Sequence, residues 1–193
     1  MTVSAQAAYT FVGSRRRILL SIFNEKQRPF YQSAITYQLP PLPRQEFARF
    51  IATLFSSRGK ACDISTAELI VDMVDSFPYY AQKLAYFVFD RAGKEAVPQD
   101  VDKGLRVLLK DETPTFEGIL LALAPQQIAL LRAIAQDPSP SLFSQGYLRR
   151  HRLGSTGGAQ AAKKKLLKLD LIEQVDKIWK VVDPVMKKWL ENR

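Results

Sequence analysis

Apolar residues recur at helical spacing through most of the chain, and this pattern predicts a mainly α-helical protein. The strongest case is residues 44–58, a helix that Gly59 closes. Its wide apolar face consists of Phe47, Phe50, Ile51, Leu54 and Phe55. Further helices are predicted at 65–74, 78–89, 99–109 and 116–123, with a capping box at Ser65 and with Pro78 in a first turn. Residues 44–124 are therefore predicted to form an all-helical block.

The last third of the chain changes from helices alone to helices followed by a hairpin. Helices are predicted at 125–135 and 141–148, and a third within 154–169, capped by Ser155 or Thr156. β-Branched residues then flank Asp176-Lys177, which predicts two short strands joined by a tight turn. Three helices and a hairpin define a winged helix, with the segment 154–169 in the position of the recognition helix.

The first 43 residues hold two β-prone segments around one helix. Strands are predicted at 9–12 and 34–39, and a helix at 15–23. This order fits the edge of an α/β sheet, although two strands alone do not make a stable one. We therefore expect a mainly α fold with a small α/β remnant, in three domains: 1–43 with the terminal strands, 44–124 as a helical lid, and 125–193 as a winged helix.

Composition narrows the class of protein further. The chain has one cysteine, Cys62, and one histidine, His151, which excludes a disulfide framework and makes a Cys–His zinc site untenable. No apolar run is long enough to cross a membrane and no secretory signal is present, so we expect a cytoplasmic protein without a membrane partner. The net charge of +9 is distributed as +7, −5 and +7 over residues 1–60, 61–124 and 125–193. A polyanion is therefore a candidate partner at either end.

Short motifs follow one another in an order that matches a known family. They are Phe11-Val12-Gly13-Ser14-Arg15, Arg28-Pro29-Phe30-Tyr31, Leu39-Pro40-Pro41-Leu42, Ser76-Phe77-Pro78-Tyr79-Tyr80, Val182-Asp183-Pro184 and Lys188-Trp189-Leu190. In this order the chain resembles the carboxyl-terminal half of prokaryotic AAA+ ATPases of the STAND type, the archaeal ATPase group. The resemblance implies that Ser14 and Arg15 lie near the terminal phosphate of a nucleotide and that Pro78 lies against the adenine. It also implies that the winged helix couples the nucleotide state to a partner.

The chain departs from this family in lacking the parts that hold phosphate and magnesium. The phosphate-binding loop Gly-x-x-x-x-Gly-Lys-Ser/Thr does not occur, because Gly59-Lys60 is followed by Ala61. We therefore expect no ATP hydrolysis by this chain alone. We expect a fragment whose missing N-terminal ATPase half would bring ATP or ADP with Mg²⁺. The exposed edge of the remnant sheet also predicts self-association into a homo-oligomer.

The basic recognition helix leaves two functions open. Gln160, Lys163, Lys164, Lys165 and Lys168 form a candidate DNA-binding set, in which the glutamine reads an adenine edge and the lysines contact phosphates. The same lysines also suit a solvated face or a protein-docking module. The sequence thus predicts the regulatory part of an ATP-dependent switch protein, with a winged-helix DNA-binding transcriptional regulator as the alternative. Steep salt dependence of duplex binding would mark the second.

Overall fold

The computed structural model describes residues 9–13, 22–37 and 41–192, and the chain divides into two compact units, residues 1–39 and 40–193. In the first unit the buried Phe23 ring lies 5.3 Å from the Phe11 ring and 6.3 Å from the Phe30 ring, between centroids. Most of the helix predicted at 15–23 lies outside the described residues; its end, from residue 22, is helical.

The two strands predicted near the N-terminus are not present in their described residues. Residues 9–12 and 34–37 take no part in a β-ladder with any described segment, and residues 38–39 lie outside the described residues. A strand is stabilised by hydrogen bonds to a neighbouring strand, and two β-prone segments without further strands do not form a sheet. The mainly α fold is confirmed; one of its small sheets is the predicted hairpin at 172–181, and the other, which pairs 61–62 with 95–96, was not predicted.

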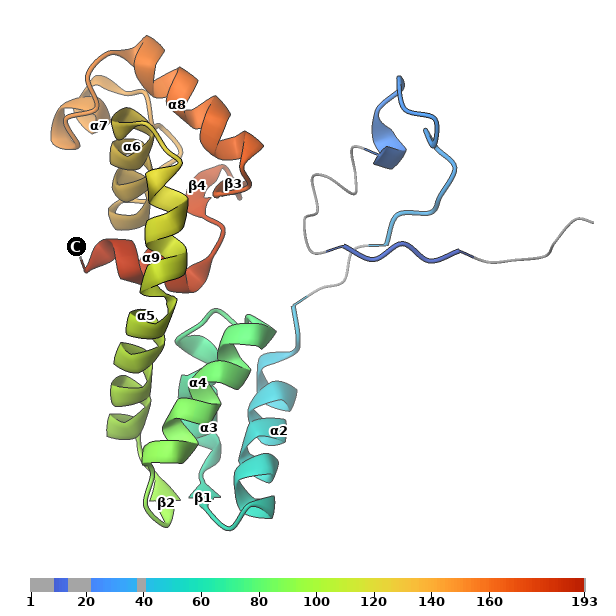
Figure 1. Cartoon of the computed structure of the whole chain (residues 1–193), viewed down its shortest axis with the longest axis vertical. Helices are drawn as coiled ribbons and strands as arrows, with labels where there is room; N and C mark the ends of the chain where they lie inside the picture. The colour runs from blue at the N-terminus through green and yellow to red at the C-terminus, as the bar shows by residue number, and fades with distance from the viewer. Residues whose placement is uncertain (1–8, 14–21, 38–40, 193) are drawn as a thin grey trace, which may run out of the picture. The chain divides into compact units, whose positions relative to one another are not determined.

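The second unit begins with a helical block (Figure 1), a name used here for residues 44–113. Its helices are α2 (Arg44–Ser57), α3 (Ile64–Asp72), α4 (Pro78–Arg91) and the first part of α5 (Pro98–Leu121). Two very short strands, β1 (Ala61–Cys62) and β2 (Glu95–Ala96), pair in parallel between them. Fully buried Ile70, Leu84 and Leu108 place the core of the block where α3, α4 and α5 meet.

The sequence predicted two helices around Pro114, whereas the structure has one continuous helix, α5, with this proline inside it. Proline removes a helical hydrogen bond and its ring crowds the preceding turn, at a cost of about 3 kcal/mol in a helix interior. Tertiary contacts on both sides of the proline offset this cost. Lys83 Nζ lies 2.5 Å from Glu112 Oε1, and the Phe116 ring packs 5.5 Å from the Trp189 ring.

The winged helix follows without a break, because α5 runs from the helical block into it (Figure 1). Its elements are α6 (Pro125–Gln136), α7 (Gln145–Arg150), α8 (Thr156–Lys168), β3 (Ile172–Val175), β4 (Ile178–Val181) and α9 (Pro184–Glu191). The wing is the antiparallel hairpin of β3 and β4, in register from Ile172–Val181 to Val175–Ile178. Its turn is formed by Asp176-Lys177, as predicted, with φ of 49° and 69°.

Two helix starts differ from the prediction. The side chain of Asp63 caps α3 by accepting a hydrogen bond from the Thr66 backbone N–H at 2.7 Å, while Ser65 Oγ donates to the Asp63 carboxylate. Ser65 thus supports the cap instead of forming it. In α7, Ser144 accepts from the Tyr147 N–H, so the helix starts later than the predicted residue 141. Among the described residues, no helix has the length and apolar character that a bilayer span requires.

Candidate functional site

The first candidate site is the turn that leads into α4, called here the Pro78 turn (residues 75–79). Asp75 and Ser76 both have left-handed backbone conformations, with φ of 50° and 58°. Each such residue costs on the order of 1–3 kcal/mol, and this kind of strain concentrates at ligand-binding and switch sites. Pro78 then occupies the first helical position, which suits its fixed φ, and the N-cap residue Phe77 makes no side-chain capping bond.

Aromatic side chains surround Pro78 and remain open to solvent. Phe77 is 44% exposed and Tyr79 is 56% exposed, whereas Tyr80 is buried. The Tyr80 ring lies 5.3 Å from that of Phe77 and 5.1 Å from that of Tyr79. Planar apolar surfaces of this kind suit the face of a purine base. Ser14 and Arg15 lie outside the described residues, so their contact with phosphate stays a prediction.

A charged network fixes the exposed side of this turn to α5. Lys83 Nζ lies 2.6 Å from Asp111 Oδ2 and 2.5 Å from Glu112 Oε1, and Tyr79 Oη lies 3.4 Å from the same Glu112 oxygen. Burial alone lowers the pKa of Lys83, but the hydrogen bonds to Asp111 and Glu112 raise this pKa above its ordinary value. The lysine is thus held as a cation that neutralises the buried Glu112.

A second interaction ties the Pro78 turn to the winged helix. Tyr80 Oη donates to Asp183 Oδ2 at 2.6 Å, across 103 positions of sequence. The other carboxylate oxygen of Asp183 accepts from the N–H groups of Val185 and Met186, which caps α9. Burial, and then the hydrogen bond to Asp183, raise the pKa of Tyr80 above its ordinary range. The hydroxyl therefore stays protonated and acts as the donor.

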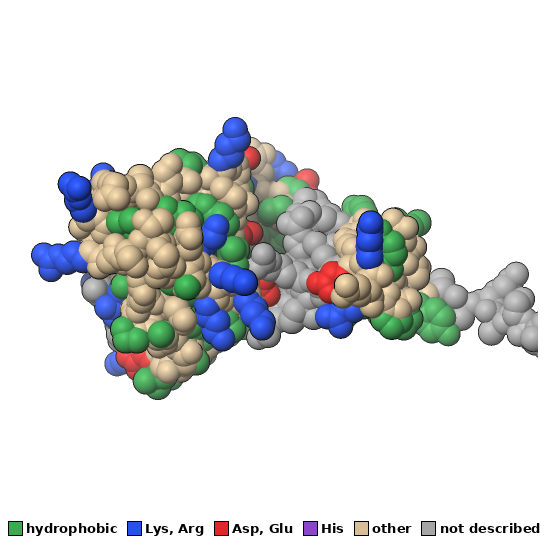
Figure 2. All heavy atoms as spheres, turned by 90° about the horizontal axis from the view of Figure 1, so that it is seen from above, with side chains coloured by type: hydrophobic (Ala, Val, Ile, Leu, Met, Phe, Trp, Pro, Cys, Tyr) green, Lys and Arg blue, Asp and Glu red, His purple; other side chains and the backbone are tan. Residues whose placement is uncertain are grey.

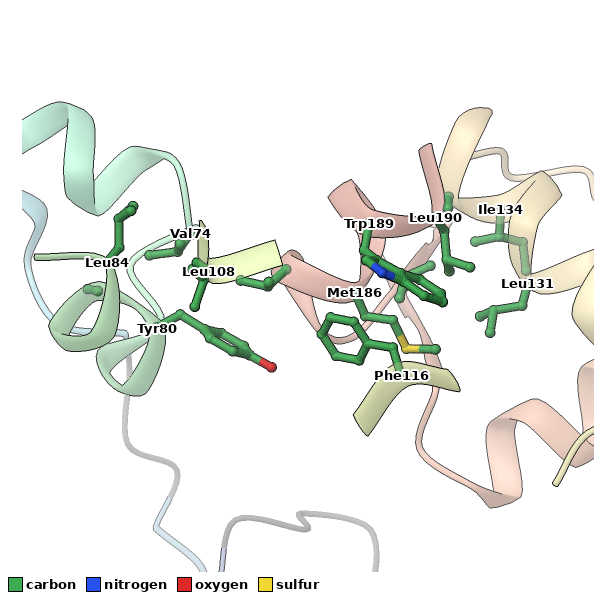
Figure 3. Close-up of a cluster of buried hydrophobic side chains, with 14 of the residues drawn as sticks. Val74, Tyr80, Leu84, Leu108, Phe116, Leu131, Ile134, Met186, Trp189 and Leu190 are labelled. Carbon is green, nitrogen blue, oxygen red and sulfur yellow. The ribbon is translucent and has the colours of Figure 1, made fainter. Parts of the chain in front are cut away.

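This tie lies between two parts of one apolar core. Figure 3 shows the Tyr80 ring beside Val74 and Leu108, with its hydroxyl directed toward the cluster of Phe116, Met186 and Trp189. Nothing in the sequence indicates this polar contact of Tyr80. Side-chain hydrogen bonds between residues so far apart in sequence leave no periodic pattern.

The second candidate site is the outer face of α8 with the wing. The helical spacing predicts that Ala159, Ala162, Leu166 and Leu169 face inward; the first three are buried, whereas Leu169 is 43% exposed at the end of the helix. Gln160, Lys164, Lys165 and Lys168 are exposed. Figure 2 looks down on the end of the winged helix where α7 and α8 lie and shows Lys and Arg side chains projecting from it, with hydrophobic side chains between them.

Lys163 differs from the other predicted lysines because aromatic rings hold its ammonium group. Nζ lies 5.3 Å from the Phe143 ring centroid and 4.6 Å from the Trp179 ring centroid. A cation between two ring faces is attracted by both quadrupoles, and Lys163 thereby joins α8 to the wing. The residues of the predicted DNA-binding set thus lie on one helix, but Lys163 makes a structural contact with the aromatic rings.

Two other basic residues of this region are also engaged. Arg150 Nη1 lies 2.6 Å and His151 Nε2 lies 3.0 Å from Asp137 Oδ2, which joins the end of α6 to the end of α7.

The close packing of α8 on α6 leaves little room for a side chain at Gly158 of α8. A Cβ at Gly158 would overlap the side-chain amide of Gln126, whose Nε2 donates to the Leu153 carbonyl at 3.0 Å.

These elements define the winged-helix class of domain. Residues 114–192 match a family model described as "Probable winged helix domain", which begins inside α5 at Pro114. Among solved structures, the chain is similar to a Walker-type ATPase of Pyrococcus abyssi, with 19% sequence identity and a TM-score of 0.65. The match covers 89% of this chain and 48% of that ATPase, so the chain spans about half its length. At this identity the likeness shows a shared fold. The comparison with curated proteins finds no match.

Proposed function

We propose that this chain is the regulatory part of a nucleotide-dependent switch of the STAND type, in which the helical block is a lid over bound ATP or ADP and the winged helix is the effector. One observation carries the proposal. The fold match to a Walker-type ATPase includes both the helical block and the winged helix, and it takes up about half of that enzyme. The order of the sequence motifs supports the same reading.

In this function the Pro78 turn contacts the adenine. Its exposed Phe77 and Tyr79 side chains offer apolar and aromatic surface, and Pro78 itself has no N–H that would need a partner. Ser14 and Arg15 would sense the terminal phosphate. Gly-x-x-x-x-Gly-Lys-Ser/Thr is absent from the sequence, so phosphate and Mg²⁺ would be held by another ATPase part, and this chain alone would not hydrolyse ATP.

The proposal is tested by titrating the ¹⁵N-labelled chain with ATP, ADP and GTP into the millimolar range. We expect amide shifts centred on Ser76, Phe77 and Tyr79 with both adenine nucleotides and weaker shifts with GTP, because the turn faces the base. A variant with Pro78→Ala should reduce the response, and Pro98→Ala, at the same first position of α5, is its matched control. Equal responses to ATP and GTP, or none at this turn, would contradict adenine contact.

A second candidate function, DNA binding, rests on one observation. Gln160, Lys164 and Lys168 are spaced four residues apart on α8, so they lie in one exposed row. A row of this kind fits a phosphate backbone or the edges of bases in a major groove. Lys163 is excluded from it by its contacts with Phe143 and Trp179.

The DNA candidate is tested by fluorescence anisotropy with a mixed-sequence duplex over a salt series. The informative variant changes Lys164, Lys165 and Lys168 to Ala. Its matched control changes Lys94, Lys103 and Lys110 to Ala, which removes the same charge from the helical block. If the winged helix binds DNA through these lysines, the logarithm of the binding constant should fall steeply with the logarithm of the salt concentration. The first variant alone should reduce the magnitude of this slope, by about 0.9 for each phosphate that a lysine no longer neutralises. Equal weakening of binding in both variants would indicate unspecific attraction by net charge.

A further inference from the structure

We propose that Asp183 of the winged helix is a positioning residue for the Pro78 turn and acts through the hydroxyl of Tyr80. The orientation of the winged helix and the place of the base-facing turn are thereby linked. This inference rests on the proposed function, because it names how that site is regulated.

The geometry places the hydrogen bond where it can transmit a displacement. Tyr80 lies two residues after Pro78 in the first turn of α4, so its ring and the proline belong to the same rigid helical turn. Its hydroxyl reaches Asp183 Oδ2 at 2.6 Å. A shift of Asp183 therefore either moves this turn or breaks the bond, since a hydrogen bond does not survive being lengthened by about 1 Å.

Asp183 is itself fixed within the winged helix. It lies two residues after the end of β4 and caps α9 with Oδ1, which accepts from Val185 at 2.9 Å and from Met186 at 2.8 Å. One carboxylate thus holds both α9 and Tyr80 at the start of α4, and the chain joins it directly to the end of the wing. Because α8 is joined to the wing by the Lys163 contact with Trp179, a partner that moves α8 would also move Asp183.

The approach to α4 holds backbone strain that a displacement of the turn would relieve. Asp75 and Ser76 hold left-handed conformations that a non-glycine residue leaves readily when its surroundings no longer impose them. With the Tyr80–Asp183 bond formed, the turn is held in its base-facing position. Without this bond, the strain favours release of the turn.

Two variants, studied in the absence of nucleotide, test the role of the Tyr80–Asp183 hydrogen bond. Asp183→Asn keeps a good N-cap for α9 and removes the charged acceptor. Tyr80→Phe keeps the ring and removes the donor. We expect both variants to move the amide signals of Ser76, Phe77 and Tyr79 in the same direction, although residue 183 lies far away in sequence. Shifts confined to α9 in Asp183→Asn would overturn the inference.

A matched control separates positioning from general loss of stability. Tyr147 is also buried, and its hydroxyl donates to the Asp137 carbonyl at 3.0 Å, within the winged helix. Tyr147→Phe therefore removes a comparable hydrogen bond that does not reach the helical block. It should lower the unfolding temperature somewhat less than Tyr80→Phe, because its acceptor is a neutral carbonyl, and leave the amides of the Pro78 turn in place. Equal movement of these amides in the control would also overturn the inference.

The nucleotide arm of the experiment keeps the two proposals distinguishable. If Tyr80→Phe leaves the turn in its binding position about a tenth of the time, the apparent Kd for ATP rises about tenfold. An unchanged Kd would contradict positioning. A wild-type chain without ATP-induced shifts would contradict the proposed function, while the amide shifts of the two variants without nucleotide would still decide whether Asp183 positions the turn.

Discussion

The indole Nε1 of Trp189 donates a hydrogen bond to Thr113 Oγ1, 2.9 Å away, one residue before the proline inside α5. The Thr113 hydroxyl in turn donates to the Leu109 carbonyl at 2.8 Å. The last helix of the winged helix thus holds α5 at the turn where Pro114 weakens it. This contact therefore supports the continuity of α5, which joins the helical block to the winged helix.

Replacing Thr113 by Val tests this contact because the side-chain shape is kept and the hydroxyl is removed. We expect the free energy of unfolding to fall by about 1–2 kcal/mol, since the hydrogen bond between the Trp189 N–H and the Thr113 hydroxyl is lost. Thr115→Val is the matched control, because Thr115 is exposed on the same helix and undergoes the same change in helix propensity. Equal destabilisation of the two variants, measured by urea denaturation, would rule out a special role for the contact.

The sequence pattern and the structure assign the N-cap of α3 to different residues, and the two assignments predict different effects of substitution. A capping box at Ser65 would make Ser65→Ala the more damaging change, whereas the structure assigns the cap to Asp63. We expect Asp63→Ala to cost about 1 kcal/mol of stability, as removal of an N-cap usually does, and Ser65→Ala to cost less. Thermal unfolding of both variants measures the difference. The reverse order would restore the sequence-based assignment.

The same cap makes stability depend on pH. Hydrogen bonds from Thr66, and then from Ser65, hold the pKa of Asp63 below its usual value of 3.8. Because the pKa is depressed in the folded state, the contribution of Asp63 is present above its unfolded pKa and is lost as pH falls through the folded pKa. The stability gap between the wild type and Asp63→Ala should therefore narrow from about pH 5 downward. A gap that stays constant would show that the cap does not need the charge.

The elements with strong local signals were predictable from sequence, and those that depend on distant partners were not. The inward face of α8 follows from the spacing of Ala159, Ala162 and Leu166, and the wing turn follows from the β-branched residues around Asp176-Lys177. In contrast, continuity of α5 through Pro114 depends on Trp189, which lies on another helix. The strands predicted at 9–12 and 34–39 are not formed in their described residues, 9–12 and 34–37, for the same reason, because a strand exists only with a neighbour.

The candidate sites likewise contain features that the sequence could predict and features that it could not. Exposure of Lys164, Lys165 and Lys168 follows from the helical period, so sequence alone placed them correctly on the outer face. The contact of Lys163 with Phe143 and Trp179 could not be predicted from the helical period. The three residues come from separate segments, which only the packing of α8 on the wing brings together. The Tyr80–Asp183 bond is hidden from sequence reasoning in the same manner.

Lys163 and Lys164 should therefore respond differently to the same substitution. Lys163→Gln removes a cation between two rings and should lower stability by about 0.5–1 kcal/mol, with a change in the fluorescence of Trp179. Lys164→Gln removes an exposed charge and should leave stability and fluorescence unchanged within about 0.5 kcal/mol. Chemical denaturation followed by tryptophan emission reports both. If neither variant differs from the wild type, the Lys163 contact does not hold α8 to the wing.

Gly104 and Gly118 lie on the same helix, α5, but differ in what surrounds them, so the same substitution should affect stability differently at the two positions. A methyl group at Gly104 would lie 3.0 Å from Val88 Cγ2 and 3.2 Å from Leu84 Cδ1, so α4 packs there against a bare backbone. A methyl group at Gly118 would meet no atom within 4 Å. Replacing either glycine by Ala adds about 1 kcal/mol of helix propensity.

At Gly118 this increment should appear as a higher free energy of unfolding. At Gly104 it is opposed by overpacking, which costs about 1–3 kcal/mol, so Gly104→Ala should be neutral or destabilising. The difference between the two variants, measured under identical conditions, isolates the close approach of α4 and α5 from the propensity of the residue itself. Equal stabilisation by both would mean that α4 moves away from α5 without cost. The Pro78 turn would then move with α4, and its position would be less firmly held than the contacts of Tyr80 and Lys83 indicate.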